Sequence, residues 1–112
     1  YVEEIRKALF IKALLKNITG KFTMEIVTDR HLDNKLRVNA ELKPGAKASS
    51  VLQKEIKESI IKVLLRENSE YRVLYGENKH KLQPEVKLWA NSDPLYFSGN
   101  GKQRWMQKPT VK

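Results

Sequence analysis

One short stretch near the end of this chain carries the residues best suited to chemistry. The sequence SGNGKQRW over residues 98–105 places Lys102 directly after Gly99 and Gly101, with Arg104 and Trp105 close behind. Glycines in this arrangement are typical of loops that need a positive φ or a close approach of the backbone to a ligand. Lys102 is therefore either an ordinary solvated charge or a cation that the loop delivers to a site elsewhere.

The residue types present argue against most other kinds of catalytic centre. There is no cysteine, so disulfide and thiolate chemistry are excluded, and a zinc site could draw only on His31, His80 and carboxylates. His31 stands in a predicted turn, where a turn residue is the favoured interpretation. Neither a P-loop nor a dinucleotide-binding glycine motif occurs, and the adjacent Glu3 and Glu4 would point to different sides of a helix. We expect no metal site and no independent hydrolase.

The aromatic residues around the glycine loop admit two interpretations. Trp89 and Trp105, interleaved with basic side chains, could stack nucleic-acid bases while the cations hold phosphates. Alternatively, large aromatic side chains could anchor the C-terminal tail to a sheet. For Tyr96 and Phe97 the anchor is the favoured prediction.

Composition sets the broad class of the protein. The 112 residues carry a formal net charge of +9, with 22 Lys and Arg against 13 Asp and Glu, which favours anionic partners. Because the basic residues are dispersed, and no known DNA- or RNA-binding signature occurs, a small nucleic-acid-binding domain is kept only as the alternative function. The length fits one domain, residues 1–112. Without an apolar run of spanning length or a signal segment, we expect a cytoplasmic protein with no membrane partner.

The first half of the chain predicts a helix followed by a hairpin. Residues 2–16 show helical periodicity, and Gly20 marks the end of that helix or the start of the next element. Apolar residues then alternate over 22–28 and again over 35–42, with a short polar connection, which is typical of an antiparallel hairpin. The apolar stripe of the helix comprises Val2, Ile5, Leu9 and Ala13.

The second half predicts a long helix and a strand. Ser50 and Gln53 form a capping-box pattern that opens a helix over residues 50–67. Residues 70–76 fit either a short strand or a helical turn. Residues 85–90, directly after a proline, predict a strand whose Val86 and Leu88 face inward. This order indicates an α+β fold, with helices packed on a small mixed or antiparallel sheet.

Three stretches also resemble a known family. They are NSEYR at 68–72, DPLYF at 93–97 and GKQRW at 101–105. Together with the order of elements over essentially the whole chain, they resemble the C-terminal domain of phenylacetate–coenzyme A ligase-like proteins, members of the adenylate-forming acyl-CoA synthetase superfamily. The resemblance implies that residues 1–112 are a lid domain cut from a longer chain and inactive alone. Its partners would be the large domain of the same chain, a carboxylic acid, ATP with Mg²⁺ bound mainly by that large domain, and coenzyme A.

The resemblance also implies roles for single residues. Lys102 would be the lysine delivered for adenylation of the carboxylate, Gly99 and Gly101 would let the backbone approach the nucleotide, and Arg104 is a weaker candidate for nucleotide contact. Arg30 and Lys35 are candidates for coenzyme A contact by position alone, and a solvated turn is the favoured interpretation of each. A non-catalytic domain that binds a partner protein through exposed aromatics is a third hypothesis.

Overall fold

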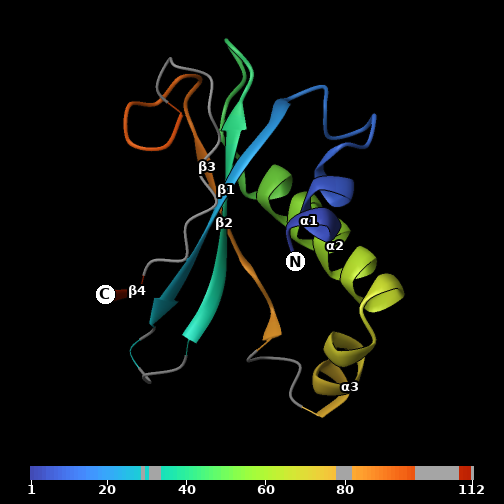
Figure 1. The fold of residues 1–112 in the computed structure, drawn as a ribbon. Coiled ribbons are helices and arrows are strands. Elements are labelled where there is room, and N and C mark those ends of the chain that lie inside the picture. The colour runs from blue at the N-terminus through green and yellow to red at the C-terminus, as the bar shows by residue number, and fades with distance from the viewer. Residues whose placement is uncertain (29, 31–33, 78–81, 98–108, 112) are drawn as a thin grey trace.

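The structure is a computed structural model that describes residues 1–28, 30, 34–77, 82–97 and 109–111 (Figure 1). In chain order the elements are α1 (Val2–Leu9), β1 (Ile18–Thr28), β2 (Asn34–Leu42), α2 (Ser50–Glu67), α3 (Ser69–Glu77), β3 (Glu85–Trp89) and β4 (Pro109–Val111). Helices and strands thus occur together in one unit, and the predicted α+β class is confirmed.

The strands form one mixed sheet in the order β3-β2-β1-β4. β1 and β2 pair antiparallel, as the predicted hairpin requires, with Met24 opposite Val38. β3 joins β2 in parallel, and β4 joins β1 in parallel. A parallel neighbour needs a crossover connection, and α2 and α3 supply it between β2 and β3.

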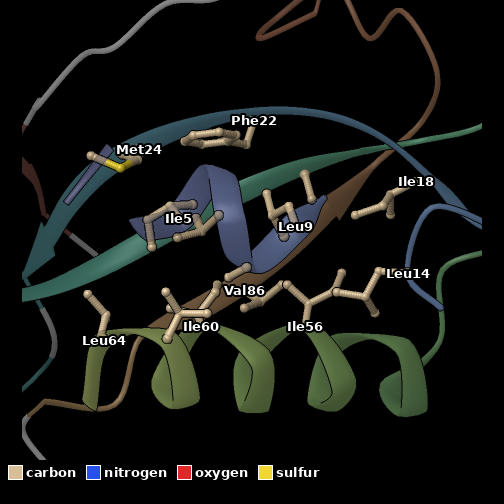
Figure 2. Close-up of a cluster of buried hydrophobic side chains, with 14 of the residues drawn as sticks. Ile5, Leu9, Leu14, Ile18, Phe22, Met24, Ile56, Ile60, Leu64 and Val86 are labelled. Atoms are coloured by element: carbon tan, nitrogen blue, oxygen red, sulfur yellow. The ribbon is translucent and has the colours of Figure 1, made fainter. Parts of the chain in front are cut away.

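The hydrophobic core lies between the helices and one face of the sheet. Figure 1 shows α1 and α2 together on the same side of the strands. In Figure 2, Ile56 and Ile60 of α2 point toward α1, whose Ile5 and Leu9 lie between α2 and Phe22 of β1. All five of these side chains are at most 1% exposed. The inward-facing Val86 of β3 is confirmed, and Leu88 packs partly buried against the same cluster.

The prediction of a helix through residue 16 is wrong, because α1 ends at Leu9. In a straight helix Leu14 would be rotated by about 140° from Leu9 and would face away from the core. The chain instead leaves the helix at Phe10 and continues through turns, so that Leu14 is buried at 2% exposure while Ala13 is exposed. The turns thus let Leu14 reach the core, which a continued helix would not do.

Gly20 lies inside β1 rather than at its boundary. The pairing of β1 with β2 shifts register between Ile18 and Phe22, which marks an irregularity in the strand. Gly20 has a φ of +92°, and a Cβ at this position would lie 2.8 Å from the ring of Phe10. Both the backbone conformation and the close approach of Phe10 therefore require glycine here.

The long helix is confirmed at residues 50–67, but its N-cap is Ser49 rather than Ser50. The Ser49 hydroxyl accepts a hydrogen bond from the Leu52 backbone N–H at 3.0 Å. Gln53 does not close a capping box: its side chain donates to the Val86 carbonyl at 3.1 Å, linking α2 to β3. The ambiguous stretch 70–76 is helical and belongs to α3, whose buried Tyr71 donates its hydroxyl to the Leu82 carbonyl at 2.8 Å.

Candidate functional site

The predicted site residues lie outside the described part of the chain. Lys102, Gly99, Gly101 and Arg104 all fall within residues 98–108, for which the structure gives no placement. The described chain reaches Phe97, immediately before this segment. The described residues nearest to the lysine loop in sequence are those from Trp89 to Phe97.

Those residues pack on the sheet face opposite α1 and α2. This polar face consists of Thr23, Glu25, Arg37, Asn39 and Glu41, each no more than 6% exposed. The hairpin register places Thr23 directly across from Asn39 and Glu25 directly across from Arg37. Buried groups of this kind must find hydrogen-bond partners to avoid a large desolvation cost. Among the described residues, no buried side-chain nitrogen or oxygen lacks one.

Glu25 is the centre of the polar face. One carboxylate oxygen accepts the Tyr96 hydroxyl at 2.7 Å, and the other accepts Asn39 Nδ2 at 2.9 Å. The Arg37 guanidinium lies 3.8 Å from Glu25 Oε2 and 3.0 Å from Glu85 Oε2. The buried negative charge of Glu25 is thus balanced by one cation, Arg37, and two hydrogen-bond donors, Asn39 and Tyr96, which come from β2 and from the chain after β3.

Asn39 connects the hairpin to β3. Its amide nitrogen also donates to Thr23 Oγ1 at 3.1 Å, and its amide oxygen accepts Trp89 Nε1 at 2.8 Å. Asn39 is fully buried. A carboxamide can donate and accept at once, which a carboxylate or an ammonium cannot do. Asn39 can therefore donate a hydrogen bond to Glu25 and accept one from Trp89 at the same time.

Glu41 holds the turn that follows β3. Its two carboxylate oxygens accept the Thr19 hydroxyl and the Ser92 backbone N–H, each at 2.7 Å. Ser92 has a φ of +58°, in the left-handed region that non-glycine residues seldom adopt. The neighbouring Asn91 donates its side-chain amide to the Leu42 carbonyl at 3.1 Å. These bonds tie the chain directly after β3 to the end of the hairpin.

The predicted aromatic anchors are confirmed for Tyr96 and Phe97. The Tyr96 ring lies 4.8 Å from the Trp89 ring between centroids, and Phe97 is 8% exposed. Burial, followed by the hydrogen bond to Glu25 and the charge of that carboxylate, raises the pKa of Tyr96 to about 12. Tyr96 therefore stays protonated at neutral pH and keeps donating to Glu25.

Arg30 and Lys35 lie at the other end of the hairpin, where they line a cleft of about 480 Å³. Arg30 is exposed and Lys35 is half-buried. Arg37 and Lys57 line the same cleft, although they come from β2 and from the middle of α2. The structure thus places the two sequence candidates beside two further cations.

Sequence reasoning missed the polar face. The alternation in the hairpin assigned Thr23 and Glu25 to the face away from Phe22 and Met24, and such a face is usually solvated in a small sheet. The usable signal was complementarity across the predicted hairpin: a threonine opposite an asparagine, and Glu25 opposite Arg37. The predicted anchors Tyr96 and Phe97 did not indicate which face of the sheet the chain after β3 covers.

The described residues place limits on other chemistry. Among them, no group of three or more His, Asp or Glu side chains is arranged to hold a metal ion. His31 and His80 lie outside the described ranges. No helix in the described ranges is long and apolar enough to cross a membrane.

Comparison with known proteins identifies the fold. No model of a protein family matches the chain, and no curated protein matches it in sequence. Among solved structures, the chain is similar to a domain of phenylacetate-coenzyme A ligase from Bacteroides vulgatus, with a TM-score of 0.50 and 16% sequence identity. The match covers 98% of this chain and 83% of that domain. The resemblance noted in the sequence is therefore confirmed at the level of fold.

Proposed function

We propose that this chain is the small C-terminal lid domain of an AMP-forming acyl-CoA ligase. The observation that carries the proposal is the likeness in fold, over 98% of the chain, to a domain of phenylacetate-coenzyme A ligase. The resemblance of residues 101–105 to the lysine segment of the same class of enzyme supports it independently. The partner in catalysis is then a large domain that binds ATP, Mg²⁺ and a carboxylic acid.

In this proposal Lys102 acts in the first of two steps. The carboxylate oxygen of the acid attacks the α-phosphorus of ATP, the bond to pyrophosphate breaks, and an acyl-adenylate forms. Two anions must approach each other, so a cation held between them offsets their repulsion and stabilises the charge that gathers on the phosphorus. The lysine ammonium is a compact charge on a long stem, which suits delivery from a lid. Gly99 and Gly101 leave room for the nucleotide, and Arg104 is a further candidate for phosphate contact.

In the second proposed step the lid rotates and Lys102 is withdrawn. The sulfur of coenzyme A then attacks the acyl carbon and AMP leaves. Such gating needs a lysine loop that moves with its domain as one body. The hydrogen bonds from Tyr96 to Glu25 and from Ser92 to Glu41 support this requirement, because they attach the chain before the loop to the sheet.

The experiment is carboxylate-dependent exchange of pyrophosphate into ATP by the complete ligase, with a panel of aryl and short-chain acids. We expect Lys102→Ala to lower exchange by about 100-fold or more, as for loss of other transition-state charge contacts. The same variant should still convert supplied acyl-adenylate to the thioester at close to the normal rate. Lys108→Ala, in the same acid-free basic segment, is the matched control and should keep normal exchange.

Two outcomes would contradict the proposal. One is the absence of exchange with every acid in the panel, and the other is normal exchange in Lys102→Ala. The alternative, nucleic-acid binding by a chain of net charge +9, would then be tested by affinity for single-stranded oligonucleotides across a salt series. The isolated 112-residue chain is expected to show no exchange in either case.

A further inference from the structure

The fold gathers at one end of the molecule lysines that are dispersed in the sequence. Residues 8–24 and 42–53 contain five lysines and no arginine, aspartate or glutamate. They include the connections from α1 to β1 and from β2 to α2, which Figure 1 shows at the end of the molecule opposite α3. The Lys43 backbone N–H joins the two connections by donating to the Asn17 carbonyl at 2.9 Å. These residues form the basic end, whose lysines are Lys12, Lys16, Lys21, Lys43 and Lys47, all exposed.

Two carboxylates lie close to the basic end, and both are already hydrogen-bonded. Glu41 is buried and accepts the Thr19 hydroxyl and the Ser92 backbone N–H, each at 2.7 Å. Asp93, in the chain after β3, is half-buried and accepts the Leu95 backbone N–H at 2.9 Å. Within the described ranges, neither carboxylate forms an ion pair with a lysine of the basic end. The five exposed positive charges therefore outnumber the nearby negative ones.

The acidic residues outside the described ranges are far from the basic end. They are Asp29 and Asp33, which adjoin Thr28 and Asn34 in sequence. Thr28 and Asn34 pair with each other at the end of the hairpin away from Ile18, the first residue of β1. Ten residues of strand span about 30 Å, about three times the screening length at physiological ionic strength. These two aspartates therefore do not neutralise the basic end.

Two large apolar side chains protrude at the basic end. Phe10 is 57% exposed and Ile11 is 40% exposed, and they are adjacent where the chain leaves α1. The Phe10 ring lies so close to Gly20 that a Cβ there would be 2.8 Å from it. This contact holds the ring against β1 while more than half of Phe10 stays in water. The basic end thus combines a positioned aromatic and an aliphatic side chain with exposed lysines.

We propose that the basic end binds the surface of an anionic lipid bilayer. Phe10 and Ile11 enter the headgroup region, and the five lysines contact anionic headgroups. Apolar side chains beside clusters of about four to eight basic residues are typical of such surfaces. Lysine is depleted in protein–protein interfaces, and arginine is the residue favoured for nucleic-acid recognition. Five lysines without an arginine therefore favour a lipid surface over either of those partners.

This inference goes beyond the proposed ligase function and does not depend on it. The expectation of no membrane partner rested on the absence of a spanning segment from the sequence. Attachment to a bilayer surface needs no spanning segment, because exposed apolar side chains and basic charges are sufficient.

The test is cosedimentation of this chain with vesicles of phosphatidylcholine, alone or with about 30% phosphatidylserine as the anionic lipid. At about 0.1 M salt we expect partitioning into the phosphatidylserine vesicles that is at least about tenfold stronger than into phosphatidylcholine alone. Raising the salt to about 0.5 M should weaken the binding, because the lysine contacts are screened.

Two double variants separate the basic end from general attraction by net charge. Lys12→Ala with Lys43→Ala removes two of the proposed contacts, and we expect partitioning to fall about 10- to 30-fold. Lys62→Ala with Lys87→Ala is the matched control, because it removes the same charge from exposed positions on α2 and β3 outside the basic end. The control should partition within about threefold of the parent chain.

A second pair of variants tests insertion of the apolar side chains. Ile11→Ala keeps every charge and should lower partitioning about 5- to 20-fold, because the bilayer no longer buries the longer side chain. Val73→Ala, at a 63% exposed position of α3 at the opposite end of the molecule, is the control and should change it by less than about twofold. Melting curves of all the variants would confirm that weakened partitioning is not unfolding.

Three results would overturn the inference. The first is no partitioning into phosphatidylserine vesicles at about 0.1 M salt. The second is equal weakening in the two double variants, or in Ile11→Ala and Val73→Ala. The third is tighter binding to single-stranded oligonucleotides than to vesicles, lost in Lys12→Ala with Lys43→Ala, which would assign the basic end to nucleic acid instead.

Discussion

The two faces of the sheet are both buried, but they are held by different physical means. The face toward α1 and α2 is apolar, and side chains such as Phe22 and Val38 contribute by area removed from water, with little demand on direction. The opposite face is covered by directional bonds from Tyr96, Trp89 and Ser92. Apolar burial therefore supplies most of the stability, whereas the polar face determines which atoms of the C-terminal chain meet the sheet.

The largest expected effect comes from breaking the apolar face. Ile60 is fully buried between α2 and the sheet (Figure 2), so Ile60→Ala removes three methyl(ene) groups and leaves a cavity. We expect a loss of about 3 kcal/mol in the free energy of unfolding, measured by urea denaturation. Val51→Ala, at a 67% exposed position of the same helix, is the control and should change it by less than about 0.5 kcal/mol. Equal effects in the two variants would contradict the description of this face as the main core.

A smaller effect is expected from breaking the polar face at Asn39. Asn39→Ala leaves Glu25 and the Trp89 indole N–H each without one hydrogen bond. Buried groups left unsatisfied cost about 1–3 kcal/mol, and we expect a loss of about 2 kcal/mol in the free energy of unfolding. Trp89 fluorescence should also change in the native state, because its indole loses its acceptor. A variant with unaltered stability and fluorescence would show that water replaces Asn39 and that the face is not fixed by these bonds.

The same contrast explains what could be predicted from the sequence. The hairpin, α2 and β3 were predictable because apolar periodicity reports burial directly, as at Ile56 and Val86. The end of α1 was not, because the turns at residues 11–17 are favoured by the tertiary contacts of Leu14, which no local pattern encodes. The hydrogen bonds that Glu25 and Glu41 accept from the chain after β3 could not be predicted for the same reason. Their partners, Tyr96 and Ser92, are 71 and 51 residues away in sequence.

Only part of the candidate site could be predicted from the sequence. Tyr96 and Phe97 could be recognised as anchors because large aromatics beside a strand seldom stay solvated. Lys57 could not be grouped with Arg30 and Lys35, since only the packing of α2 against β3 brings the three to one cleft. Lys102 remains a prediction from the sequence, outside the described residues.

The smallest expected effect at neutral pH concerns two tyrosines, one on each face of the sheet, whose pKa values respond to different neighbours. Tyr71, a residue of α3 in the core cluster, and Tyr96, on the polar face, both have a pKa raised to about 12. For Tyr71 the causes are burial and then the neighbouring Tyr75 and Tyr1. For Tyr96 they are burial and then Glu25, so Glu25→Gln should lower the pKa of Tyr96 and leave that of Tyr71 unchanged. Ultraviolet titration of tyrosinate, with Tyr96→Phe to identify the signal, measures both.

The sign of the stability effect follows from the same values. A tyrosine whose pKa rises from 10 unfolded to about 12 folded contributes stability that is complete below pH 10 and is lost as the pH rises toward 12. Tyr96→Phe should cost about 1 kcal/mol at neutral pH, through the lost bond to Glu25, and should make the fall in stability between pH 10 and 12 shallower. Tyr71→Phe, which removes a tyrosine with the same raised pKa, is the control and should make the fall shallower to a similar degree. If Glu25→Gln shifted both tyrosines equally, the coupling would be a general effect of net charge. A specific hydrogen bond between Glu25 and Tyr96 on the polar face would then be contradicted.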